Sequence, residues 1–144
     1  PVKVPTMHIR FENRVVLVTG AAQGIGQAIA LGFKQAGALV YLADMDEHGV
    51  KDFARINAMQ AFAFDVGQRA QCHECVKQIT AQQGRLDILV NAAGGNQPAA
   101  VVTPENPMTK LPLTAWKENF DLNLVGVARV CRAAIPHLRS AGWG

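Results

Sequence analysis

One stretch decides the fold: Val15-Val16-Leu17-Val18-Thr19-Gly20-Ala21-Ala22-Gln23-Gly24-Ile25-Gly26. Its first four residues are apolar and mostly β-branched, a pattern typical of a strand that is buried on both faces. The spacing of apolar residues after the glycines predicts an amphipathic helix over residues 25–35. A buried strand, a glycine-rich turn and a helix in this order indicate the first unit of a parallel α/β sheet.

The three glycines of the turn each have a physical use. Gly20 permits the tight turn, Gly24 lets a diphosphate approach the backbone, and Gly26 lets the helix pack against the sheet. Free N–H groups and the positive end of the helix dipole then favour an anion. The turn therefore predicts a dinucleotide site, although a turn without a ligand remains the alternative. A nucleoside-triphosphate loop is excluded, because Gln27 and Ala28 stand where Lys and Ser or Thr are needed.

Strands and helices alternate along the rest of the chain. We expect strands at residues 14–19, 38–43, 61–66 and 86–90, and further helices at 47–56, 68–83 and 115–139. Thr114 is the expected N-cap of the last helix, with Glu118 placed for a capping contact. This alternation predicts an α/β fold, a Rossmann-type doubly wound parallel sheet with helices on both faces. The sheet is expected to be truncated in this chain, with its strands, numbered along the sequence, in the order 3-2-1-4. Residues 11–144 form the expected domain, and residues 1–10 the leader before it.

Asp44 follows the second predicted strand. A carboxylate there can accept hydrogen bonds from both hydroxyls of an adenosine ribose, and its charge repels a 2′-phosphate. NAD is therefore favoured over NADP, because no Lys or Arg stands among the neighbouring residues Ala21, Ala22, Gln23 and Met45. The alternative is that Asp44 only caps a turn with Asp46 and Glu47.

Composition excludes several functional classes. Hydrophobic residues make up 49% and charged residues 17% of the 144, an ordinary globular balance. The net charge of +3 is scattered, which argues against a nucleic-acid partner. The apolar runs are too short to span a membrane, and no secretory signal opens the chain. We therefore expect a cytoplasmic protein.

Three cysteines, an odd number, also fit a reducing compartment. Cys72 and Cys75 form a Cys-x-x-Cys pair, for which a redox role or a zinc site are the alternatives. A zinc site needs a second pair of ligands, and the sequence offers none. We expect two ordinary thiols on one helix face.

The motif Thr-Gly-x-x-x-Gly-x-Gly at residues 19–26 resembles the signature of the short-chain dehydrogenase/reductase family. Asp65-Val66 resembles the family's adenine contact, and Asn91-Ala92-Ala93-Gly94 resembles its Asn-Asn-Ala-Gly segment. Asn123 resembles the asparagine of the catalytic tetrad, whose carbonyl holds a water in a proton relay. The resemblance implies a nicotinamide dinucleotide as cofactor, and Asp44 favours NAD. Its expected ligands are Gly20, Ala22, Gln23, Gly24, Ile25, Gly26, Asp44, Asp65, Val66, Asn91, Ala92, Ala93 and Gly94.

The resemblance further implies hydride transfer between nicotinamide and a small-molecule secondary alcohol or ketone. The opening Gly95-Asn96-Gln97 of the following proline-rich loop resembles sugar or polyol enzymes, and the loop would border the substrate pocket. The resemblance also implies assembly through the long helix into a homodimer or homotetramer. Two alternatives remain at single residues: Asp65 as a strand-end cap, and Asn91 as a residue that only satisfies backbone groups. Asn123 lies in the middle of the predicted helix, which indicates a local distortion or a bound water, in agreement with the role that the resemblance implies.

The family's Ser and Tyr-x-x-x-Lys are not found in residues 1–144. The single tyrosine, Tyr41, is followed four residues later by Met45, and the single serine is Ser140. We expect these catalytic residues beyond Gly144, so that this truncated chain alone is inactive and its fourth strand is left as an apolar edge. The alternative function is a non-catalytic module that binds a dinucleotide.

Overall fold

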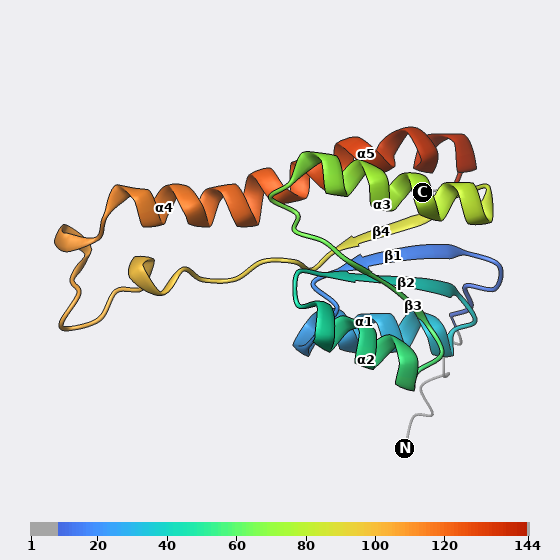
Figure 1. The fold of residues 1–144 in the computed structure, drawn as a ribbon, viewed down its shortest axis with the longest axis horizontal. Coiled ribbons are helices and arrows are strands. Elements are labelled where there is room, and N and C mark those ends of the chain that lie inside the picture. Colours follow the sequence, from blue (N-terminus) through green and yellow to red (C-terminus); the bar gives the residue numbers. More distant parts are fainter. Residues whose placement is uncertain (1–8, 144) are drawn as a thin grey trace, which may run out of the picture.

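The computed structural model of the protein describes residues 9–143, and a four-stranded parallel sheet lies at its centre (Figure 1). The strands are β1 (Val15–Thr19), β2 (Leu39–Asp44), β3 (Gln60–Ala63) and β4 (Ile88–Asn91). Their order is β3-β2-β1-β4, which confirms the predicted Rossmann-type arrangement. Because all four strands run parallel, their carboxyl ends meet at one edge of the sheet.

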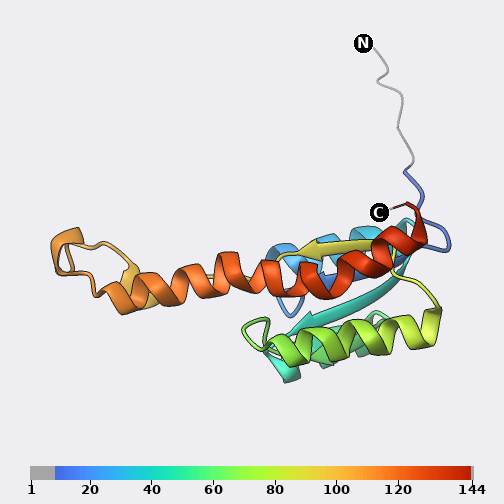
Figure 2. The ribbon, with the colours of Figure 1, turned by 90° about the horizontal axis from the view of Figure 1, so that it is seen from above.

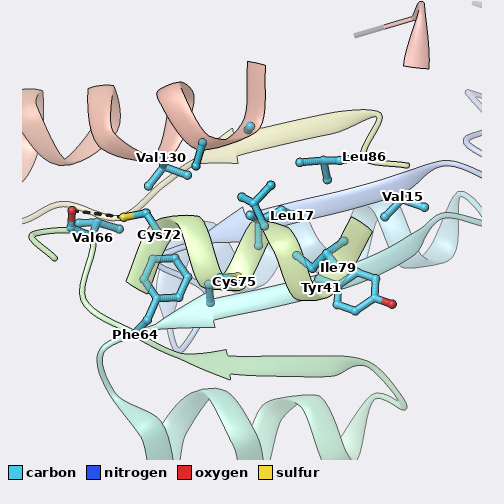
Figure 3. Packing of buried hydrophobic residues seen from close by; sticks show 14 residues of the cluster. Val15, Leu17, Tyr41, Phe64, Val66, Cys72, Cys75, Ile79, Leu86 and Val130 are labelled. Atoms are coloured by element: carbon cyan, nitrogen blue, oxygen red, sulfur yellow. Dashed lines mark hydrogen bonds between the residues drawn. The ribbon is translucent and has the colours of Figure 1, made fainter. Parts of the chain in front are cut away.

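Helices cover both faces of this sheet. α1 (Gly24–Gln35) and α2 (Glu47–Ile56) lie on one face, and α3 (Arg69–Gln83) and α5 (Gly126–Ala141) lie on the other (Figure 1). Successive side chains of β1 therefore enter two separate cores. Leu17 packs with Ile79 and Val130 on the α3 and α5 side (Figure 3). Val16 and Val18 pack with residues of α1 and α2 on the other side.

Two helix faces differ from the spacing-based expectation. In α1 the buried positions are Gly26 and Ala30, whereas Ile25 is 77% exposed. Small residues at these positions let α1 lie close to the sheet. In α2, whose apolar spacing predicts that Val50, Ala54 and Ile56 face the sheet, Val50 and Ala54 are buried but Ile56 at the last position is exposed.

Strand boundaries also differ from the expected ones. β3 ends at Ala63 rather than at residue 66, because the side chain of Asp65 accepts the N–H of Gly67 and turns the chain. β4 begins at Ile88 rather than at residue 86. Just before it, the carboxylate of Asp87 accepts the N–H of Val15 at 2.9 Å, in the place of a strand carbonyl.

After β4 the chain forms a projection that we call the arm, residues 96–120 (Figures 1 and 2). It contains the short helices η1 (Pro98–Ala100) and η2 (Met108–Lys110), and the helix α4 (Leu113–Phe120). The predicted N-cap Thr114 is wrong, because Pro112 precedes the helix and Thr114 lies inside its first turn. The fixed φ of Pro112 lets the helix start directly after it. Trp116 stacks on Phe120 with ring centroids 6.2 Å apart.

The single long helix expected over residues 115–139 is interrupted. The π-helical turn η3 (Asp121–Val125) joins α4 to α5. The predicted local distortion at Asn123 is confirmed, since Asn123 lies in the middle of this turn. Among residues 9–143, no helix has the length and apolarity needed to cross a bilayer.

An ionic cluster around the buried carboxylate of Asp87 lies at the amino ends of β1 and β4. Asp87 is fully buried and pairs with Arg14 and Arg85. Burial favours the neutral form of Asp87, but the hydrogen bonds from Arg85, Val15 and Arg14 outweigh it, so its pKa lies below the ordinary value. The guanidinium of Arg14 also lies 4.3 Å from the ring centroid of Trp143, after the end of α5. The cluster thus ties the start of β1 to β4 and to the end of α5.

Candidate dinucleotide-binding site

A cleft of about 530 Å³ opens at the carboxyl ends of the strands. Four segments line it: the turn after β1, the ends of β2 and β3, and the segment after β4, with Leu122 of η3 added. The lining residues are Gly20, Gln23, Gly24, Ile25, Gly26, Ala43, Asp44, Met45, Asp46, Phe64, Asp65, Val66, Ala92, Ala93, Gly94 and Leu122. The structure therefore brings together eleven of the thirteen expected cofactor ligands.

The glycine turn is built by close backbone approach. Gly20 has a φ of +67°, and a Cβ there would lie 2.5 Å from the carbonyl oxygen of Ala92. A Cβ at Gly26 would overlap the carbonyl of Gly20. The side chain of Gln23, the N-cap residue of α1, makes no capping hydrogen bond within residues 9–143, and no acidic residue stands in the first turn of the helix. Its first N–H groups are therefore free to bind an anion in the cleft.

Asp44 is held from two sides by the backbone. Its Oδ2 accepts the N–H of Ala22 at 3.0 Å, and its Oδ1 accepts the N–H of Asp46 at 3.0 Å. The turn-capping role considered as an alternative is thus part of the structure. A carboxylate can accept about four hydrogen bonds, so capacity remains for a ligand. Ala22 does not line the cleft, and its N–H serves to orient Asp44.

The adjacent wall contains Asp65 and Val66. Oδ1 of Asp65 accepts the N–H of Gly67 at 2.7 Å, so the strand-end cap is also present. Asp44, Asp46 and Asp65 together make this end of the cleft acidic. No lysine or arginine is among the lining residues of the described chain.

The segment after β4 is held by Thr19 and Asn91. The buried hydroxyl of Thr19 accepts the N–H of Ala93 at 3.2 Å and lies 3.4 Å from the carbonyl oxygen of Val90. Asn91 does not line the cleft, and its Nδ2 contacts Sγ of Cys131 at 3.5 Å. Its buried Oδ1 has no partner within residues 9–143. Asn91 therefore stands behind the cleft wall.

Asn123 does not line the cleft either, but it fixes the chain beside it. Its Oδ1 accepts the N–H of Gly95 at 3.0 Å, and its Nδ2 donates to the carbonyl of Gly95 at 2.8 Å. A Cβ at Gly94 would lie 2.6 Å from this Oδ1. Asn123 thus pairs with the backbone that continues the cleft wall.

Several titratable groups lie outside the cleft. Tyr41 is buried in β2, its hydroxyl accepts a hydrogen bond from Gln83, and burial raises its pKa. The hydroxyl of Ser140 donates to the carbonyl of Pro136 in α5. Burial raises the pKa of Cys72, and that of Cys75 to about 12, so both thiols are protonated at neutral pH. Such groups are poor nucleophiles and poor metal ligands.

Sequence reasoning missed five lining residues: Ala43, Met45, Asp46, Phe64 and Leu122. Four of them are sequence neighbours of Asp44 or Asp65, so widening each predicted strand end by one or two positions would have found them. Leu122 is brought in by the π-helical turn, which no local pattern specifies. Thr19 stood in the quoted motif, but its bond to Ala93 joins segments far apart in the sequence.

Comparison with known proteins defines the class. The family model for short chain dehydrogenase matches residues 14–144. The chain therefore belongs to the short-chain dehydrogenase family of oxidoreductases.

Particular relatives share this part of the fold. L-fucose dehydrogenase of Oryctolagus cuniculus is 34% identical over 131 residues, which are 90% of this chain and 44% of that protein. D-threitol dehydrogenase of Mycolicibacterium smegmatis is 34% identical over 140 residues, 94% of this chain and 51% of that protein. The solved RhlG/NADP active-site complex of Pseudomonas aeruginosa is 29% identical with a TM-score of 0.78, and covers 93% of this chain and 50% of that one. The chain spans about half the length of the curated relatives it matches.

Proposed function

We propose that this chain binds NAD(H) in the cleft, and that the protein transfers hydride between nicotinamide and a secondary alcohol or ketone of the sugar or polyol type. The orientation of Asp44 carries the cofactor assignment. Its carboxylate is fixed by two backbone N–H groups at the acidic end of the cleft. There it can accept hydrogen bonds from an adenosine ribose, and it repels a 2′-phosphate.

The rest of the cleft fits the same cofactor. The free N–H groups at the start of α1 suit the diphosphate, since Gly20 and Gly26 leave no Cβ in the turn. The adenine would lie beside Asp65 and Val66, and the nicotinamide half beside Ala92, Ala93 and Gly94. Bound nicotinamide would supply or accept the hydride, while the chain orients it and excludes a phosphorylated ribose.

Two relatives and the loop after Gly94 support the proposed substrate class. Two of the relatives are named for the oxidation of a sugar and of a polyol. The loop after Gly94, which opens with Gly95-Asn96-Gln97, is polar and adjoins the nicotinamide half of the cleft. We also propose that the protein is a homo-oligomer in the cytoplasm and that Asn123 is a catalytic residue. The three free thiols within residues 9–143 are compatible with a reducing compartment.

Fluorescence titration of the chain with NADH and NADPH tests the cofactor assignment. We expect Asp44→Ala to weaken NADH binding about tenfold or more and to reduce the preference over NADPH, since one fixed carboxylate is lost. Asp52→Ala, an exposed acid on α2, is the matched control and should change neither affinity. Equal losses for both cofactors would remove Asp44 as the selecting residue. Absence of NADH binding to the unaltered chain would overturn the proposal.

A further inference from the structure

Two asparagines, one in α4 and one in η3, contact the loop that follows β4. Asn119 lies in the last turn of α4, and Asn123 follows four residues later in η3. Residues four apart on a helix lie on the same face. Both side chains are directed at the backbone that leaves β4.

Their partners alternate along the extended start of the loop. Oδ1 of Asn119 accepts the N–H of Gln97 at 3.0 Å. Asn123 pairs with both the N–H and the carbonyl of Gly95, and its Nδ2 also donates to the carbonyl of Asn119 at 2.9 Å. The two side-chain amides therefore supply the hydrogen bonds that a neighbouring strand would give to residues 95–97.

Gln97 is the position where the loop changes direction. It precedes Pro98, at which η1 begins, and proline has no N–H of its own to anchor the backbone. The carbonyl of Gln97 accepts the N–H of Ala100 at 2.9 Å, which closes the η1 turn. Because Asn119 fixes the N–H of the same residue, in the preceding peptide unit, it sets where the turn lies relative to Gly94.

We propose that Asn119 is a positioning residue, which acts through Gln97 to hold the start of the loop against the nicotinamide half of the cleft. This role rests on the proposed function, because it assumes that the cleft beside Gly94 receives nicotinamide. Asn123 holds the first contact of the loop, and Asn119 holds the second. With one contact the loop can rotate about Gly95, a residue with wide backbone freedom, whereas with two its path is fixed.

Two variants of the chain separate positioning from mere structure. Asn119→Ala removes the acceptor, and Asn119→Asp keeps an acceptor oxygen of the same shape. We expect amide hydrogen exchange at Gln97 to rise about fivefold in Asn119→Ala, as for the loss of one hydrogen bond, and to stay unchanged in Asn119→Asp. Glu118→Ala, at the exposed neighbouring position, is the control and should leave the exchange unchanged.

Emission of bound NADH provides the functional measurement. Nicotinamide fluoresces more strongly where protein shields it from water. We expect Asn119→Ala to lose most of this enhancement with an NADH Kd within about twofold of the unaltered chain, because the adenosine contacts remain. Asn119→Asp should restore the emission.

Three results would overturn the role of Asn119: unchanged exchange and emission in Asn119→Ala, failure of Asn119→Asp to restore them, or an equal effect of Glu118→Ala. Failure of the unaltered chain to bind NADH is a different outcome. It overturns the proposed function and with it the link to nicotinamide, while exchange at Gln97 still decides whether Asn119 holds the loop.

Discussion

The sheet with its flanking helices and the arm are built on opposite principles. Every side chain of β1 is buried, and two apolar clusters enclose it from both sides. In the arm, Leu113 is 84% exposed, and Met108 and Phe120 are more than half exposed. The sheet is thus held by burial, whereas the segment that leads from Gly95 into the arm is held by the hydrogen bonds of two asparagines. The sheet and the arm therefore depend on different interactions within one chain.

A matched pair of leucine substitutions tests this difference with the largest expected effect. Leu17→Ala should lower the free energy of unfolding by about 3 kcal/mol, because it leaves a cavity between β1, α3 and α5. Leu113→Ala should change it by less than about 0.5 kcal/mol, since that side chain is in water. Urea unfolding followed by circular dichroism measures both. Similar losses in the two variants would show that the arm is packed after all.

The ionic cluster at Asp87 gives the next effect. Asp87→Asn should cost about 2 kcal/mol, because the buried carboxylate loses its charged hydrogen bonds with Arg85 and Arg14. The pKa of Asp87 is lowered in the folded chain. Its contribution is therefore complete above the unfolded pKa near 4 and is lost as pH falls further, through the folded value.

Unfolding measured between pH 6 and pH 2 checks this sign. The unaltered chain should lose more stability over that interval than Asp87→Asn does. Asp52→Asn, an exposed acid paired with Arg55, should retain both the stability and the acid slope of the unaltered chain. An equal acid slope in Asp87→Asn would show that another carboxylate dominates.

The cap of α2, which α4 lacks, gives the smallest expected effect on stability. Oδ1 of Asp46 accepts the N–H of Gly49 at the start of α2, whereas α4 has no side-chain cap. Asp46→Ala should cost about 1 kcal/mol in thermal unfolding, and Asp46→Asn, which can still cap, should cost a few tenths. If the two variants lose the same amount, the charge of Asp46 and not its hydrogen bond stabilises α2.

Much of the fold could be predicted because local signals agree. The bounds of α2 at Glu47 and Ile56 were given correctly by one acidic start and one apolar period. The β–α alternation predicts a parallel sheet, whereas the observed order β3-β2-β1-β4 is the one expected for a Rossmann-type fold. The end of β3 was wrong, because Phe62 and Phe64 continue the apolar pattern although Asp65 turns the chain. Alternation of side chains cannot show where hydrogen bonding to β2 stops.

The candidate site was predictable where it is local. The glycine turn, Asp44 and Asp65 each stand in a short motif, and all line the cleft. The contact of Thr19 with Ala93 and that of Asn119 with Gln97 join distant segments, so no window of the sequence contains them. Asn123 signalled a distortion by its poor helix propensity, but its partner Gly95 could be found only in three dimensions.

The two tryptophans of the chain lie one in each region. Trp143 rests on Arg14 beside the sheet, and Trp116 stacks on Phe120 in α4. Each half of the architecture therefore carries its own optical probe. In a chain that retains only Trp116, fluorescence emission would report changes in the arm. In a chain that retains only Trp143, it would report the unfolding of the sheet.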